Sequence, residues 1–241
     1  MFVSLAANAQ EYPRGDVSHD GQVNITDVTW LINYLLTDTW PENPETPDDH
    51  EWVDLGLTSG TLWATMNVGA TAPEEIGDYF AWGEIEPKEV YEWITYKWCN
   101  GTSDSMTKYC TSISGIVDGK SELEPEDDAA YMNWGPQWRI PTYNQIIELV
   151  NECTWTWTSV NGKDGRLGTG PNGNTLFIPV AGYRIHEDIK DPAWGYYWSR
   201  NVYDYNANMA NNMVFHSQLV FRGASNRHVG EPVRPVRISQ E

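Results

Sequence analysis

The sequence is poor in positive charge. Only 15 of its 241 residues are Lys or Arg, against 34 Asp or Glu, which gives a formal net charge of −19. A surface this acidic repels the phosphates of nucleic acids and anionic lipid headgroups, so functions on nucleic acids or membrane surfaces are disfavoured. The sequence also has no run of about 18 apolar residues, so we predict no membrane-spanning helix.

Several catalytic signatures are missing as well. The five histidines show neither metal-ligand spacing nor an HExxH motif. The glycines at 168 and 170 are not followed by the Gly-Lys-Ser/Thr of a phosphate-binding loop. Four acids between positions 124 and 128 could serve glycoside hydrolysis, but acids in the first turn of a helix explain them better. We therefore predict that the protein is not an enzyme.

Cysteine is scarce, and three cysteines cannot all pair within one chain. Cys99 and Cys110 are eleven positions apart, and a disulfide closing that loop would contribute about 3 kcal/mol through loop entropy. We predict this disulfide. Cys153 is left over among Thr and Trp residues, where a buried thiol is a better interpretation than a reactive nucleophile.

The N-terminus indicates export. Residues 1–10 form a short apolar run that ends in small residues, and Ala7-Asn8-Ala9 matches the A-x-A cleavage pattern of signal peptides. No basic segment precedes the run, so we interpret it as a truncated signal peptide, with an ordinary chain start as the alternative. Residues 37–50 alternate Pro with acids and predict a stiffened linker.

Residues 11–36 carry a calcium-loop pattern. Oxygen-bearing side chains occupy loop positions 1, 3, 5, 9 and 12, a Gly provides the turn at position 6, and the carbonyl of residue 7 completes the shell. The predicted Ca²⁺ ligands are Asp16, Ser18, Asp20, Gln22, Asn24 and Asp27. An apolar helical run follows at Val28, Leu31, Ile32, Leu35 and Leu36. An Asp- and Asn-rich turn that caps a helix without metal is the alternative.

This stretch, GDVSHDGQVNITDVTWLINYLL, resembles one dockerin-type repeat. Dockerins have two such repeats packed together, and here there is one. The resemblance implies a calcium-stabilised helix and a docking partner for the repeat.

Residues 51–241 predict an α+β domain. Short strands punctuated by Gly are expected at 52–57, 61–67 and 78–82, and a helix is expected at 123–133. Thr142 should cap a second helix with an apolar face, and a turn at 171–174 should precede a strand at 176–179.

Motifs such as VDLGLTSGTLWATMNVGA, GDYFAWGE, LEPEDDAAYMNWG, WRIPT, PVAGYR and VRPV resemble the major-paralogous-domain (FISUMP) family of exported bacterial proteins, over residues 52–236. The resemblance implies a C-type lectin-like fold, related to the formylglycine-generating enzymes, with a ligand-binding face near the C-terminus. Those enzymes hold copper through a cysteine pair near the C-terminus, and no cysteine follows Cys153 here.

The segment 201–230 is rich in Asn, with six in 30 residues against twelve in the other 211. It resembles the variable region of proteins diversified by retroelements; an ordinary exposed sheet edge is the alternative. Strand alternation should place residues 211, 216, 218, 220 and 222 on one face. The predicted ligand contacts are Asn201, Tyr203, Asp204, Tyr205, Asn206, Asn211, His216, Gln218, Val220, Arg222, Ser225, Asn226, His228 and Val229, with Tyr205 and Arg222 as anchors.

Together these features predict a secreted or cell-surface bacterial protein, adhesin-like or receptor-like, whose C-terminal face binds a protein or glycan. One alternative is a carbohydrate-binding module that uses exposed aromatic rings. Another is a relative of the formylglycine-type oxidases that uses Cys153.

Overall fold

The computed structural model describes residues 28, 31–32, 35, 50–111 and 115–237. The chain divides into two units, Met1–Asp48 and Asp49–Glu241. The four described residues of the first unit, at 28, 31, 32 and 35, are helical with exposed side chains, which confirms a helix at these positions. The predicted signal peptide, the six calcium ligands and the linker up to residue 49 lie outside the described residues. Every helix that the structure describes falls short of the length and apolar character needed to cross a membrane.

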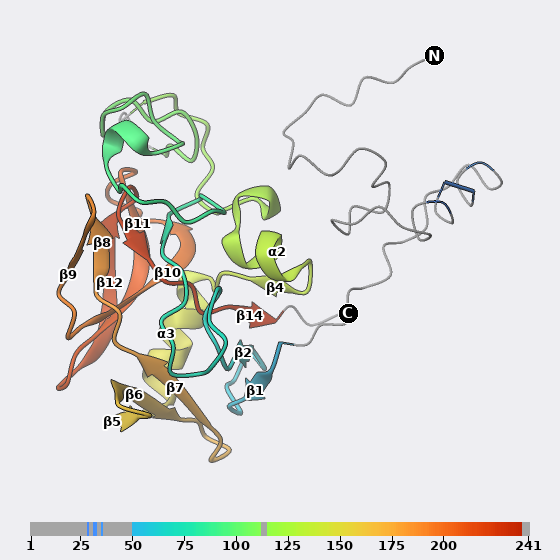
Figure 1. Cartoon of the computed structure of the whole chain (residues 1–241), viewed down its shortest axis with the longest axis vertical. Coiled ribbons are helices and arrows are strands. Elements are labelled where there is room, and N and C mark those ends of the chain that lie inside the picture. The colour runs from blue at the N-terminus through green and yellow to red at the C-terminus, as the bar shows by residue number, and fades with distance from the viewer. Residues whose placement is uncertain (1–27, 29–30, 33–34, 36–49, 112–114, 238–241) are drawn as a thin grey trace. The chain divides into compact units, whose positions relative to one another are not determined.

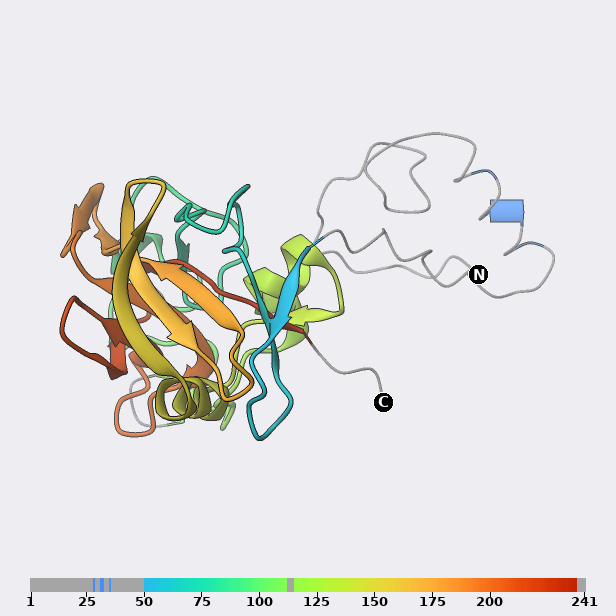
Figure 2. The same cartoon turned by 90° about the horizontal axis from the view of Figure 1, so that it is seen from below.

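The second unit is built from four antiparallel sheets (Figure 1). Two have four strands each, in the orders β1-β2-β14-β4 and β3-β13-β8-β9, and two have three strands each, β5-β6-β7 and β10-β11-β12. Seen from below, β5, β6 and β7 form one twisted antiparallel sheet (Figure 2). The strands are β1 (Trp52–Asp54), β2 (Leu62–Ala64), β3 (Phe80–Ala81), β4 (Trp138–Arg139), β5 (Thr154–Val160), β6 (Lys163–Thr169), β7 (Thr175–Pro179), β8 (Tyr183–Ile185), β9 (Asp188–Lys190), β10 (Gly195–Val202), β11 (Met209–Phe215), β12 (Val220–Asn226), β13 (Gly230–Glu231) and β14 (Val236–Arg237).

The α+β, C-type lectin-like prediction is wrong, because the unit is a β-rich fold. Within 50–111 and 115–237 the structure has fourteen strands but only two α-helices, α2 (Ala129–Trp134) and α3 (Tyr143–Glu152), and two 3-10 turns, η1 (Trp93–Thr95) and η2 (Pro125–Asp127). The helix predicted from residue 123 begins only at Ala129, since Pro125 starts a 3-10 turn. Asp128 then caps α2 by accepting hydrogen bonds from the backbone amides of Ala130 and Tyr131.

The local signals for α3 and for one hairpin are confirmed. The hydroxyl of Thr142 accepts a hydrogen bond from the Gln145 amide at 3.1 Å, and the Gln145 side chain accepts one from the Thr142 amide at 2.8 Å. This reciprocal pair fixes the start of α3. The turn at 171–174 joins β6 to β7 as predicted.

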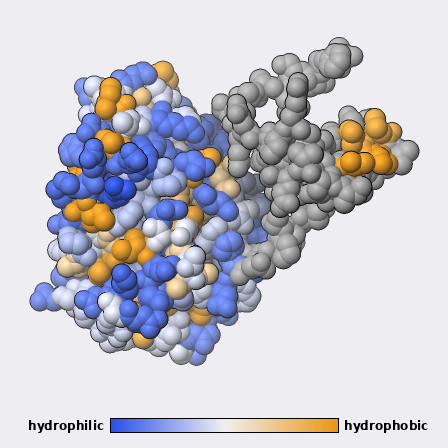
Figure 3. Space-filling view, in the orientation of Figure 1, coloured by the Kyte–Doolittle hydropathy of each residue, from blue (hydrophilic) through white to orange (hydrophobic). Residues whose placement is uncertain are grey.

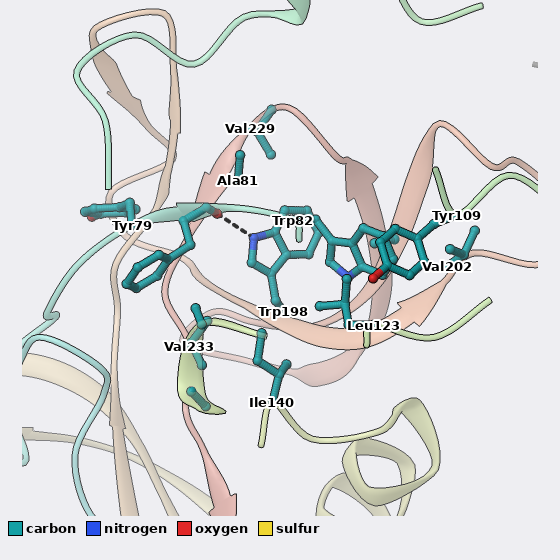
Figure 4. Close-up of a cluster of buried hydrophobic side chains, with 14 of the residues drawn as sticks. Tyr79, Ala81, Trp82, Tyr109, Leu123, Ile140, Trp198, Val202, Val229 and Val233 are labelled. Atoms are coloured by element: carbon teal, nitrogen blue, oxygen red, sulfur yellow. Dashed lines mark hydrogen bonds between the residues drawn. The ribbon is translucent and has the colours of Figure 1, made fainter. Parts of the chain in front are cut away.

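Two apolar cores hold the sheets together. In the first, the indole of Trp198 donates a hydrogen bond to the Phe80 carbonyl at 2.8 Å (Figure 4). The indole of Trp82 donates to the Ser199 carbonyl, also at 2.8 Å. These bonds tie β3 to the centre of β10. In the second core, α3 packs against the sheet β10-β11-β12 through Ile146 and Leu149. The strand β10 is therefore fixed on both faces.

Arginines near the C-terminus lie partly inside the protein. Arg227 is fully buried and donates hydrogen bonds to the Tyr96 hydroxyl and to three backbone carbonyls. Arg234 is also buried and donates to the Asn67 side chain at 2.7 Å. Burial lowers the pKa of Arg234 to about 10. Two of the five Arg after residue 195 are thus buried and add no surface charge.

The predicted disulfide between Cys99 and Cys110 is not formed. The loop folds so that Met106, not Cys110, lies opposite Cys99 in a β-bridge. The thiol of Cys99 donates to the Trp93 carbonyl at 3.1 Å, and Cys110 is buried in the first core. Sequence separation alone could not distinguish these two arrangements.

Candidate ligand-binding site

Eleven of the fourteen predicted contact residues are exposed or half-buried. The other three, Asn211, His228 and Val229, have buried side chains, although Asn211 lines a cavity described below. Val229 belongs to the first apolar core, and the ring of His228 packs 4.3 Å from that of Trp93. Burial lowers the pKa of His228 to about 4, so this ring is neutral at physiological pH.

The predicted contact residues do not form one face, because the β11-β12 hairpin separates those at its turn from those at its open end. The hairpin pairs Phe215 with Val220 at its turn and Met209 with Asn226 at its open end. The two pairs are six residue steps apart along the strand, which corresponds to about 20 Å. The predicted alternation of residues 211 to 222 on one strand is wrong because residues 216–219 form the turn, closed by the His216 amide donating to the Leu219 carbonyl.

At the open end lies a polar cavity of about 220 Å³. It brings together three predicted residues with the start of α3 and with residues 121–122, which sequence reasoning missed. Its lining residues are Ser121, Glu122, Thr142, Tyr143, Asn144, Asn201, Val202, Asp204 and Asn211. The cavity is smaller than the roughly 300–1,000 Å³ typical of sites for drug-sized ligands. It therefore fits a small ring or a single side chain.

Asn201 organises the wall of this cavity. Its side-chain oxygen accepts a hydrogen bond from the Tyr143 amide at 2.8 Å, and its nitrogen donates to the Glu122 carboxylate at 3.3 Å. Glu122 also lies 2.6 Å from the guanidinium of Arg200. Backbone bonds from Leu123 to Arg200 and from Val202 to Ser121 hold the two segments side by side. The start of α3, the end of β10 and the 121–123 segment are thus fixed to one another.

The loop beside the cavity presents an aromatic pair. The rings of Tyr203 and Tyr205 have centroids 5.4 Å apart, and Tyr205 is 86% exposed. The Tyr203 amide donates to the Met209 carbonyl and the Asn206 amide to the Tyr203 carbonyl, so the backbone of the loop is held. Among described Trp, Tyr and Phe residues, Trp52 is the other exposed ring. The exposed ring of Tyr205 is therefore accessible to a ligand.

The turn end of the hairpin is a second, separate surface. The His216 ring lies 4.4 Å from that of Trp194, and its carbonyl accepts a hydrogen bond from Arg166 at 3.0 Å. Gln218 and Leu219 are exposed in the turn. Arg222 is exposed on β12, opposite Met213, between the two ends.

The acids and the thiol considered as catalytic groups are either engaged in hydrogen bonds and ion pairs or buried. Asp127 accepts hydrogen bonds from the Tyr109 hydroxyl and from Lys108, each at 2.6 Å, and Asp128 pairs with Arg139 at 2.7 Å. Burial raises the pKa of Cys153 to about 11, which disfavours its thiolate. Within the described part of the chain, no three His, Cys, Asp or Glu side chains are grouped to hold a metal ion.

Residues 14–55 match the family model of the dockerin type I domain. This match contains all six predicted calcium ligands and extends past residue 36, the predicted end of the repeat, into β1. No curated protein and no solved structure matches the chain. The resemblance of residues 52–236 to the FISUMP family gains no support from these comparisons.

Proposed function

We propose that residues 51–241 form a non-enzymatic binding module whose ligand contacts lie around the polar cavity and the Tyr203–Asn206 loop. The observation that carries this proposal is the 86% exposure of Tyr205 next to a cavity with a hydrogen-bonded wall. A large ring held on a fixed backbone gives contact area at low entropic cost. On the face seen in Figure 3, hydrophobic side chains occur in small groups among hydrophilic ones, which does not favour recognition through a broad apolar patch.

The test compares Tyr205→Ala with Ile94→Ala, which removes an exposed apolar side chain outside the site. Each immobilised protein captures ligands from bacterial and host surface extracts, and bound proteins and glycans are identified by mass spectrometry. We expect a ligand that the parent and Ile94→Ala retain and Tyr205→Ala loses. Equal capture by all three proteins, with no ligand lost on Tyr205→Ala, would contradict the proposed site.

A glycan ligand is the second candidate, because an exposed tyrosine ring can stack on a sugar. A glycan array distinguishes the two: saturable binding that Tyr205→Ala abolishes would identify a carbohydrate-binding module.

Retroelement diversification of residues 201–230 is a related proposal, and eleven of the fourteen predicted ligand contacts in this segment have accessible side chains. A near-copy of the codons for 198–236, with adenines at the varying positions, should lie beside a reverse transcriptase gene. A genome without such a copy would exclude this proposal.

We also propose that the dockerin-like segment binds Ca²⁺, docks to a protein partner and belongs to a secreted or cell-surface protein. Support comes from the family match at 14–55 and from a donor set of carboxylate, hydroxyl, amide and carbonyl oxygens, the ligands that Ca²⁺ prefers. When bound, the ion would fix the loop before the helix that contains Val28. In calorimetry, Ca²⁺ should bind the parent and Asp38→Ala, whose acid lies outside the loop, but not Asp20→Ala. An absence of heat with the parent would refute calcium binding.

A further inference from the structure

The side-chain oxygen of Asn211 is one group of the polar cavity that can accept a hydrogen bond from a ligand. Asn211 is only 3% exposed, lines the cavity, and donates its side-chain nitrogen to the Val202 carbonyl at 2.9 Å. Among the described residues, none donates a hydrogen bond to its side-chain oxygen. Asn201, by contrast, has its oxygen engaged by Tyr143 and its nitrogen by Glu122. This oxygen remains accessible from the cavity, so an occupant that supplies a donor can bond to it directly.

The charges around the cavity are net negative. Glu122 and Asp204 both line it, and Arg200 compensates Glu122. No Lys, Arg or His of the described residues forms an ion pair with Asp204. The N-terminus of α3 adds the equivalent of about +0.5 charge, which leaves roughly −0.5 at the site.

From the acceptor oxygen of Asn211 and the unpaired carboxylate of Asp204 in one small cavity, we infer that this cavity takes a single cationic side chain, Lys or Arg, of a protein ligand. The inference rests on the proposed binding function and selects a protein with an exposed basic residue as the ligand class. An ammonium carries three donors and a guanidinium five, and neither carries an acceptor. A neutral sugar would leave the charge on Asp204 uncompensated.

The test uses the full chain, labelled with ¹⁵N, and four probes: acetyl-Gly-X-Gly-amide peptides with X as Lys, Arg, norleucine or Glu. The Lys or Arg peptide should shift the amide signals of Tyr143, Asn201 and Asp204 in a saturable way, and the peptide with the tighter saturation identifies the preferred cation. The norleucine and Glu peptides should leave these signals unchanged. Asp204→Asn should weaken binding about fivefold, the effect expected for one exposed charge pair. Asp104→Asn removes the same charge at an exposed site elsewhere and should change the affinity less than about twofold.

The outcomes separate this inference from the binding function itself. Equal shifts with norleucine, or equal affinities of Asp204→Asn and the parent, would overturn the cationic-side-chain inference. So would shifts of the same amides by methyl β-glucoside with none from the Lys and Arg peptides, although the binding function would stand. If Tyr205→Ala also retained every captured ligand, the binding function would fail with it.

Discussion

Glu231 gives the sharpest test of the electrostatics inside the main unit. Its carboxyl group is fully buried on β13, and both of its oxygens accept from the side-chain nitrogen of Asn212, at 2.9 and 3.0 Å. Burial raises its pKa from 4.5 to about 8, although hydrogen bonds from Ser225 and Asn212 act in the opposite direction. The folded protein therefore keeps this group protonated at pH 7, where the unfolded chain ionises it.

The difference between the pKa values of Glu231 in the folded and unfolded states sets the size and the sign of the pH dependence of stability. Below pH 4.5 both states are protonated, so Glu231 carries no penalty. Between pH 4.5 and pH 8 only the unfolded chain releases the proton, so the free energy of unfolding falls by about 1.4 kcal/mol per pH unit. Relative to its value below pH 4.5, the free energy of unfolding is lower by about 3 kcal/mol at pH 7 and by about 4–5 kcal/mol at pH 8.

Glu231→Gln removes this dependence. A glutamine can accept from Asn212, and its amide can donate to the side-chain oxygen of Asn212, which is buried without a hydrogen-bond partner. We expect the variant to be more stable than the parent by about 3 kcal/mol at pH 7 and to match it near pH 4.5.

The assay is urea unfolding from pH 4.5 to pH 8, followed by the fluorescence of the thirteen Trp. Glu89→Gln, at an exposed position, should change stability little throughout. Parallel curves for the parent and Glu231→Gln across this range would refute the reasoning.

Three further results are expected. The thiol of Cys153, with its pKa raised to about 11 by burial, should react with a disulfide reagent far more slowly in the native protein than after unfolding; equal rates would contradict its burial. The His228 ring should titrate near pH 4 by NMR, and a midpoint near 6.5 would contradict this. Because burial depresses its pKa from 6.5, about 3 kcal/mol of the free energy of unfolding should be lost as the pH falls from 6.5 towards 4. Asn67→Leu removes an acceptor of the buried Arg234 guanidinium and should cost about 2 kcal/mol in urea unfolding, whereas a loss below about 0.5 kcal/mol would contradict that role.

The features predicted correctly from the sequence depend on neighbouring residues. The Thr142 cap needs Gln145 three positions later, and the turn at 171–174 needs only its own residues. Such interactions close within a few residues, so composition and spacing reveal them.

The features predicted wrongly depend on distant parts of the chain. The cavity needs residues 121–122 beside the end of β10, a pairing across about 80 positions that no local pattern records. The sequence predicts residues 211, 216, 218, 220 and 222 on one strand face, but the turn at 216–219 divides them between two strands of a hairpin. Asn211 and His228 look like exposed polar residues in the sequence, whereas the packing around β11 and Trp93 buries them.

The position of β14 has a consequence for biosynthesis. This last strand lies between β2 and β4 and hydrogen-bonds to both, so the sheet that contains β1 cannot close before Val236 and Arg237 have been synthesised. The strands β1 and β2 can therefore complete their sheet only after residues 65–237 have been synthesised. During that interval the edge of β2 that pairs with β14 lacks its hydrogen-bonding partner.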